Sequence, residues 1–225
     1  MAVEMEGRLE RVVDHGANTR SLFLRLPVPL AFRPGQFISC LLPVDGAELV
    51  RPYSIASNPE EGERIELLLD RVPGGPGSTY LCGLSAGATI RFTGPWGTFV
   101  LDQAPAAETV FIADGTAIAP IRPMLKRALA SRPTHPLRLL YGMASPDRVL
   151  YRGELEALAR AQALFTFEPV VSAALREEVA RRYVVADADR SRHFFICGVG
   201  GVVPALRDLL RHAGYARRAV QYEKW

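Results

Sequence analysis

From about residue 104 onward, the chain alternates short apolar runs with amphipathic helical patterns. Ile121, Met124, Leu125, Ala128 and Leu129, for example, recur at i, i+3, i+4, i+7 and i+8, which is one face of a helix. Strand–helix alternation predicts parallel pairing and a doubly wound α/β sheet, whose ligands bind at the carboxyl ends of the strands. The expected strands are 109–113, 137–141, 165–171, 194–197 and 219–222, and the other expected helices are 154–163, 174–183 and 203–210.

The first hundred residues follow a different pattern. Apolar runs such as 21–26, 36–41 and 65–69 are separated by clusters of Pro and Gly. Regular short strands with turn signals predict an antiparallel barrel or sandwich. The change of pattern near residues 103–106 therefore predicts two domains: a small antiparallel β-barrel over 1–103 and a nucleotide-binding α/β domain over 104–225.

The composition excludes several classes of protein. Apolar residues at 48% and charged residues at 23% are typical of a soluble globule, and a net charge of +3 is too small to indicate a nucleic-acid or membrane partner. No apolar run approaches the ~20 residues of a membrane span, and the first nine residues lack an apolar signal core. The spacing of Cys40, Cys82 and Cys197 excludes a zinc knuckle and a ferredoxin-type iron–sulfur loop. With scattered thiols and no histidine ligand spacing, we expect a cytoplasmic protein without a metal site.

Two segments of the first domain have residue types that suit a flavin site. In Arg51-Pro52-Tyr53-Ser54, Arg51 can hold a phosphate, Tyr53 can lie against an isoalloxazine ring, and Ser54 can approach the reactive nitrogen. A solvated strand end explains this segment equally well. The segment 74–79, Gly-Gly-Pro-Gly-Ser-Thr, is either a phosphate cradle or a flexible hairpin loop.

These motifs stand in an order that resembles the ferredoxin–NADP(H) reductase superfamily. The family's Arg-x-Tyr-Ser motif matches 51–54, its Gly-rich flavin segment matches 74–79, and its Gly-Pro-aromatic-Gly-x-Phe turn matches 94–99. Its Gly-Thr-Gly-Ile-Ala-Pro loop is similar to 115–120, and its Cys-Gly strand end is similar to Cys197-Gly198. The ordered matches cover nearly the whole chain. They therefore outweigh the alternative interpretations of single segments as a solvated strand end or a flexible loop.

The resemblance implies a flavin, FAD in preference to FMN, and NADH or NADPH as the substrate. It also implies roles for particular residues. Ser54, Cys197 and Glu223 would frame the reacting atoms. The flavin would be held by Arg51, Pro52, Tyr53, Ser54, Gly77, Ser78 and Thr79, and the nucleotide pocket would be lined by Gly115, Thr116 and Gly198.

The end of the printed sequence carries a further match. Plant-type members of the family finish in Glu-x-Tyr, with the aromatic ring stacked on the flavin. Glu223-Lys224-Trp225 has the same spacing, with Trp in place of Tyr. By resemblance, Trp225 would cover the flavin and move aside for the nucleotide, so that 51–54 and 223–225 form two sides of one flavin site.

The nucleotide-binding half departs from the family pattern at four positions. Asp114 and Ala117 stand where the family usually has Gly, and Asp114 would either repel a pyrophosphate or cap the following helix. Ala144 and Ala173 stand where many members have an Arg that binds a 2′-phosphate. These departures favour NADH over NADPH, with Arg148 and Arg152 as the alternative partners of a 2′-phosphate.

The function implied by the resemblance is electron transfer between NAD(P)H and a separate one-electron carrier, such as a ferredoxin or an oxygenase component. Two alternatives remain open at this point. The chain could be an electron-transfer subunit of a larger complex with a weakened nucleotide site, or a reductase that releases free reduced flavin.

Overall fold

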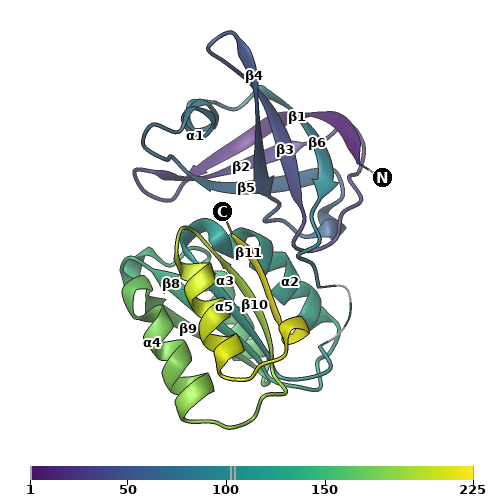
Figure 1. The fold of residues 1–225 in the computed structure, drawn as a ribbon. Coiled ribbons are helices and arrows are strands. Elements are labelled where there is room, and N and C mark those ends of the chain that lie inside the picture. The colour runs from purple at the N-terminus through teal and green to yellow at the C-terminus, as the bar shows by residue number, and fades with distance from the viewer. Residues whose placement is uncertain (1, 102, 104, 225) are drawn as a thin grey trace. The chain divides into compact units, whose positions relative to one another are not determined.

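The computed structural model describes residues 2–101, 103 and 105–224, which divide into two compact units. The first unit contains the residues up to 101 together with Arg122–Met124, and the second contains the remaining described residues. Figure 1 shows an antiparallel sheet in the first unit and a parallel sheet with helices in the second.

The first unit is a six-stranded antiparallel sheet in the order β4-β3-β6-β1-β2-β5. A bridge between Ile55, just after β4, and Leu67 of β5 joins the two ends of this order and curls the sheet into a barrel. The strands are β1 Val3–Asp14, β2 Thr19–Arg25, β3 Phe37–Val44, β4 Ala47–Ser54, β5 Arg64–Asp70 and β6 Thr89–Trp96. A short helix, α1 Pro76–Cys82, precedes β6.

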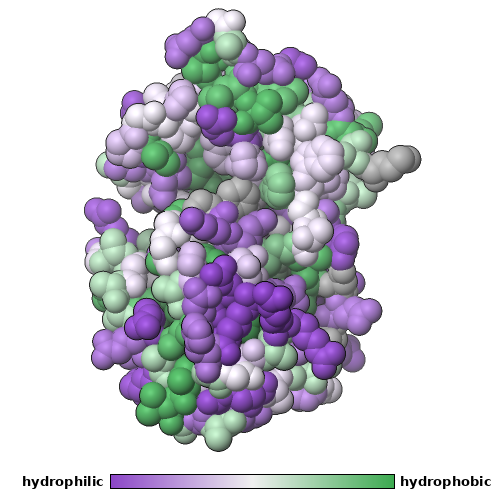
Figure 2. All heavy atoms as spheres, in the orientation of Figure 1, coloured by the Kyte–Doolittle hydropathy of each residue, from purple (hydrophilic) through white to green (hydrophobic). Residues whose placement is uncertain are grey.

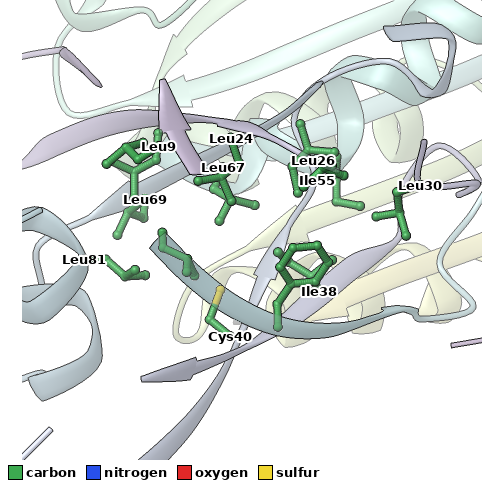
Figure 3. Packing of buried hydrophobic residues seen from close by; sticks show 14 of the residues in the cluster. Leu9, Leu24, Leu26, Leu30, Ile38, Cys40, Ile55, Leu67, Leu69 and Leu81 are labelled. Atoms are coloured by element: carbon green, nitrogen blue, oxygen red, sulfur yellow. The ribbon is translucent and has the colours of Figure 1, made fainter. Parts of the chain in front are cut away.

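Alternating side chains of these strands fill the barrel. Leu22 and Leu24 of β2, Ile38 and Cys40 of β3, and Leu67 of β5 are fully buried, and all five belong to one cluster. Figure 3 labels Leu24, Ile38, Cys40 and Leu67 within this cluster. Because side chains alternate across a strand, every second residue faces this interior. The predicted antiparallel barrel is confirmed.

Two segments of this unit differ from expectation. Residues 94–96, expected as part of a tight turn, form the end of β6, and the chain turns only at Gly97, whose φ is +103°. Residues 76–79, for which a hairpin loop was the alternative reading, form the first turn of α1. Pro76 suits this position because its fixed φ matches a helix start.

The second unit is a five-stranded parallel sheet in the order β11-β10-β7-β8-β9. The helices α4 and α5 cover one face of this sheet, where Val110, Ile112, Phe194 and Ile196 form a buried cluster with apolar residues of both helices. Since parallel crossovers are right-handed, the reversal of direction after β9 places α2 and α3 on the opposite face. The elements are β7 Thr109–Asp114, α2 Ile118–Ala130, β8 Leu137–Met143, α3 Arg152–Ala161, β9 Phe165–Val171, α4 Leu175–Ala180, β10 His193–Gly198, α5 Val202–His212 and β11 Val220–Lys224.

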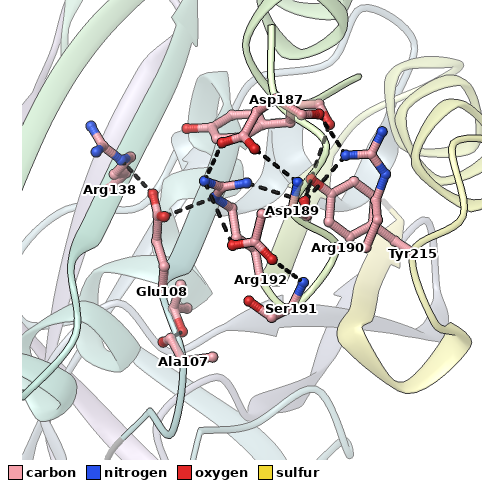
Figure 4. Close-up of polar contacts among 11 residues, drawn as sticks. Ala107, Glu108, Arg138, Asp187, Asp189, Arg190, Ser191, Arg192 and Tyr215 are labelled. Atoms are coloured by element: carbon pink, nitrogen blue, oxygen red, sulfur yellow. Dashed lines mark hydrogen bonds and ion pairs between the residues drawn. The ribbon is translucent and has the colours of Figure 1, made fainter. Parts of the chain in front are cut away.

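The doubly wound parallel sheet is therefore confirmed, and the chain continues from α4 into a π-helical turn, Arg181–Val185. A network of ion pairs lies at the amino ends of the strands (Figure 4). Glu108 pairs with Arg138 at 2.6 Å and with Arg192 at 2.7 Å, and Arg192 also pairs with Asp187. This network fixes the loop before β10, and it leaves the carboxyl ends of the strands for a ligand.

Candidate functional site

The segment 51–54 forms the last four residues of β4, an edge strand of the barrel. The side chains of Arg51 and Pro52 are exposed, Tyr53 is half-buried, and Ser54 is only 6% exposed. Burial in the barrel wall raises the pKa of Tyr53, so its hydroxyl stays protonated at neutral pH. The segment presents a cation, a protonated phenol and a hydroxyl along one strand.

The Ser54 hydroxyl is an unusual group within the barrel. Its Oγ is buried and has no hydrogen-bond partner in the part of the chain that the structure describes. A buried polar atom without a partner costs about 1–3 kcal/mol, so such atoms usually mark a site where a ligand or water bonds. The position fits a bound group that offers a donor or an acceptor.

The Gly-rich segment lies against Arg51. A Cβ at Gly77 would come within 3.0 Å of Arg51 Cγ and 3.3 Å of Leu42 Cδ1, so the close approach requires glycine or a shift of the Arg51 stem. Ser78 is largely committed to the local fold, because its Oγ accepts from Val72 N at 3.0 Å and donates to Gly75 O at 3.1 Å. Thr79, in contrast, is exposed and keeps its hydroxyl available.

In the second unit, the predicted nucleotide residues lie at the carboxyl ends of neighbouring strands. Gly115 and Thr116 follow β7, Cys197 and Gly198 end β10, and Glu223 pairs in register with Cys197 from β11. Gly115 has a φ of +59°, and its carbonyl accepts a hydrogen bond from the Tyr141 hydroxyl at 2.9 Å. Parallel pairing thus gathers residues that are up to 108 positions apart in the sequence at one edge of the sheet.

Glu223 is a half-buried carboxyl group. Its Oε2 is buried without a partner among residues 2–101, 103 and 105–224, and burial raises its pKa from 4.5 to about 7. A carboxyl group with a pKa near neutrality can donate or accept a proton at physiological pH. Trp225, its predicted neighbour over the flavin, lies outside the described residues.

The structure decides the role of the Asp114 side chain. It makes no capping hydrogen bond to the following helical turn. Instead, its Oδ1 accepts a hydrogen bond from Ser172 Oγ, 58 residues away at the end of β9. The sequence offered no signal for this pair, because the contact depends on the order of the strands. Ala144 and Ala173 are both exposed.

No group of three or more His, Cys, Asp or Glu side chains among the described residues could hold a metal ion. Within the same residues, none of the helices has the length and apolar character needed to cross a membrane.

Comparisons with known proteins match both halves of the chain. Residues 6–101 match the family model of an oxidoreductase FAD-binding domain, and residues 111–208 match that of an oxidoreductase NAD-binding domain. A ferredoxin–NADP reductase B of Sorangium cellulosum is 36% identical over 208 residues, which are 86% of this chain and 85% of the relative.

Two similar proteins come from Amycolatopsis. The reductase subunit of an aromatic O-demethylase is 31% identical over 225 residues, covering 95% of this chain and 67% of the relative. The crystal structure of the cytochrome P450 reductase GcoB has a TM-score of 0.88 at 27% identity and covers 99% of this chain and 70% of that one. The chain belongs to the ferredoxin–NADP(H) reductase superfamily and is an oxidoreductase that uses FAD and a nicotinamide nucleotide.

Proposed function

We propose that this protein takes hydride from a nicotinamide nucleotide and passes single electrons to a separate protein carrier, a ferredoxin or an oxygenase component. The observation that carries the proposal is the succession of an FAD-binding and an NAD-binding domain along 194 of the 225 residues. The names of two relatives, a ferredoxin–NADP reductase and the reductase subunit of an aromatic O-demethylase, support the kind of partner. A bound flavin supplies the conversion between hydride and single-electron transfer.

In this proposal, residues 1–103 bind the flavin and residues 104–225 bind the nucleotide. Arg51, with its stem against Gly77, holds a phosphate of the FAD, and the exposed Thr79 adds a hydroxyl donor. Tyr53 lies against the flavin ring with Pro52 beside it, and Ser78 supports the loop rather than the ligand, because its hydroxyl is already bonded twice. The sequence predicts the same flavin-binding role for Ser78 and Thr79, whereas in this proposal only Thr79 of the two contacts the flavin.

The reacting groups on the protein would be Ser54, Cys197 and Glu223. Ser54 Oγ has no hydrogen-bond partner among the residues that the structure describes and can therefore bond a polar atom of the ring system. Glu223 can hold a proton at about pH 7. Gly115, Thr116 and Gly198 line the nucleotide pocket at the carboxyl edge of the sheet. Trp225 keeps its predicted role over the flavin, and the cytoplasm, a reducing compartment, remains the predicted location of the protein.

An anaerobic titration tests the proposal. The flavin-loaded protein is titrated with NADH and with NADPH, and bleaching of the flavin absorbance is recorded. We expect stoichiometric bleaching by at least one nucleotide, followed by reoxidation on addition of an oxidised [2Fe–2S] ferredoxin. If neither nucleotide bleaches the flavin, the chain is no NAD(P)H reductase. If the bleached flavin elutes free of the protein in gel filtration, free-flavin release replaces protein electron transfer.

A further inference from the structure

A buried carboxylate lies at the end of the central strand of the parallel sheet. Asp114 closes β7 with extended backbone, at φ −130° and ψ 120°, and only 8% of the residue is exposed. Ser172 Oγ donates a hydrogen bond to its Oδ1 at 2.5 Å. Over the described ranges of the chain, no Lys, Arg or His side chain lies within ion-pair distance of this carboxylate, and its Oδ2 accepts no hydrogen bond. A buried charge without a cation is costly unless hydrogen bonds satisfy it, so Oδ2 has capacity for a donor from a ligand.

The surroundings of this carboxylate are shaped by glycines on two neighbouring strands. Gly142 pairs in register with Asp114 from β8, and a Cβ there would lie 2.7 Å from Oδ1. On the other side, a Cβ at Gly198 of β10 would lie 3.6 Å from the Cβ of Asp114. A Cβ at the following Gly115 would meet nothing within 4 Å. The carboxylate therefore stands at the open carboxyl edge of the sheet, where nucleotides bind in folds of this architecture.

The chemistry of such a group distinguishes the two nicotinamide nucleotides. NADH has a ribose hydroxyl where NADPH has a 2′-phosphate, and a carboxylate accepts a hydrogen bond from a hydroxyl. A phosphate monoester carries nearly two negative charges and offers a carboxylate no comparable donor. It needs an Arg or Lys partner, and the residue after Ser172 is Ala173.

We propose that Asp114, oriented by Ser172, makes this protein select NADH over NADPH. This inference rests on the proposed function and names the substrate of that same site. The Asp114 carboxylate accepts a hydrogen bond from a ribose hydroxyl of NADH, and it repels the 2′-phosphate of NADPH. Ser172 acts as a positioning residue, because it holds Oδ1 and leaves Oδ2 for the ligand. This preference for NADH is the reverse of the one that the name of the Sorangium relative, a ferredoxin–NADP reductase, indicates.

Two kinds of measurement test this assignment on the full chain. Isothermal titration calorimetry gives the dissociation constants of NAD⁺ and NADP⁺, independently of turnover. Anaerobic stopped-flow reduction of the flavin-loaded protein gives the corresponding values for NADH and NADPH. The variants are Asp114→Asn, Asp114→Gly and Ser172→Ala. Glu177→Gln is the matched control, because Glu177 is an exposed carboxylate on α4 of the same unit.

We expect the wild-type protein to bind NAD⁺ about tenfold or more tightly than NADP⁺, since one unfavourable charge interaction near a protein surface is of that size. Asp114→Asn should reduce this ratio about tenfold, mainly by tightening NADP⁺, because the amide removes the repulsion. Ser172→Ala should reduce the ratio by a smaller factor. Glu177→Gln should leave the ratio as in the wild type. Asp114→Gly provides the same test should the Asn variant fail to fold.

Three outcomes would overturn the inference. The wild-type protein could prefer NADP⁺. The Asp114 variants could change both affinities by the same factor, which would make the carboxylate a structural group or a general barrier to pyrophosphate. The control could shift the ratio as much as Asp114→Asn does. In all three cases a nucleotide still bleaches the flavin, so the proposed function stands. If neither nucleotide binds or bleaches, the proposed function and this inference both fail.

Discussion

At the scale of single residues, two of the buried serines of the barrel, Ser54 and Ser57, have opposite roles. Ser57 Oγ accepts a hydrogen bond from the backbone N–H of Glu66 at 3.0 Å, so it satisfies a buried donor. Ser54 Oγ, three residues earlier, has no such partner in the described chain. Both side chains are buried, but only the Ser57 hydroxyl satisfies a backbone group of the barrel, which leaves the Ser54 hydroxyl for the proposed ligand.

The two serines give a paired prediction. Ser57→Ala strands a buried N–H and should lower the free energy of unfolding by about 1–3 kcal/mol. Ser54→Ala should not lower the free energy of unfolding, because Ser54 Oγ has no hydrogen bond to lose, and yet it should slow flavin reduction by NAD(P)H roughly tenfold or more. Urea denaturation and stopped-flow reduction measure the two effects. Equal loss of stability in both variants would contradict a ligand-directed role for Ser54.

Glu223 provides a residue-scale prediction about pH. Its pKa rises from 4.5 to about 7 on folding, so the folded protein holds a proton that the unfolded chain releases between these values. Stability from this group is therefore intact below about pH 4.5 and falls as pH rises to about 7. Glu223→Gln should be more stable than the wild type at pH 8 by on the order of 1 kcal/mol, after allowance for partial solvent screening, and equal to it at pH 4.

Thermal unfolding of Glu223→Gln and the wild type at both pH values measures this difference. Gln221→Glu serves as a comparison, because it adds a carboxyl group on the same strand, two residues away. A difference of the same size at pH 4 and pH 8 would show that the raised pKa is not the cause.

At the scale of elements, the carboxyl ends of β7 and β8 pack together because Gly142 of β8 has no side chain. Asp114 and Gly142 pair across the two strands, and the carboxylate of Asp114 occupies the space that a Cβ on Gly142 would need. Leu175, at the start of α4, closes the same space at 3.1 Å. Glycine at position 142 is thus required by the packing of this chain's own Asp114.

Gly142→Ala should therefore destabilise the second unit by about 1–3 kcal/mol, since the new methyl overlaps Asp114 and Leu175. The double variant Gly142→Ala with Asp114→Gly should recover a large part of this loss, because the carboxylate no longer fills the space. Denaturation of the two single variants and the double variant gives the coupling energy. Strict additivity would show that the two residues do not compete for this space.

At the scale of the whole molecule, the net charge is confined to one region. Residues 207–224 contain five Lys or Arg and two Asp or Glu, a net +3 that equals the charge of the entire chain, so the remaining residues are balanced. Figure 2 shows strongly hydrophilic side chains gathered over α5 and the segment that follows it. The ring of Tyr222 is exposed and lies near two guanidinium groups. Its centroid is 5.3 Å from Cζ of Arg207 and 5.4 Å from Cζ of Arg211. A protein carrier with an acidic surface would be attracted to this region.

This distribution predicts how the protein responds to salt. The double variant Arg217→Glu/Arg218→Glu reverses two exposed charges of the region, and it should raise the KM for an acidic [2Fe–2S] ferredoxin about tenfold and flatten its dependence on ionic strength. Reduction of the neutral acceptor dichlorophenolindophenol should change little. Arg160→Glu, an exposed arginine on α3, is the control. An equal effect of the control would show that overall charge, rather than this region, steers the carrier.

The sequence by itself determined the two architectures, since apolar periodicity in each segment reflects which side chains must be buried. The sequence also indicated the family, because the order of the motifs along the chain can be recognised without a structure. The tertiary structure decided what depends on strand order and local packing. Ser78 turned out to be bonded to its own loop, residues 94–96 joined β6 rather than a turn, and Asp114 met Ser172 from 58 positions away. The Asp114–Ser172 contact forms only because parallel strands bring distant ends to one edge of the sheet, and no pattern in neighbouring residues encodes it.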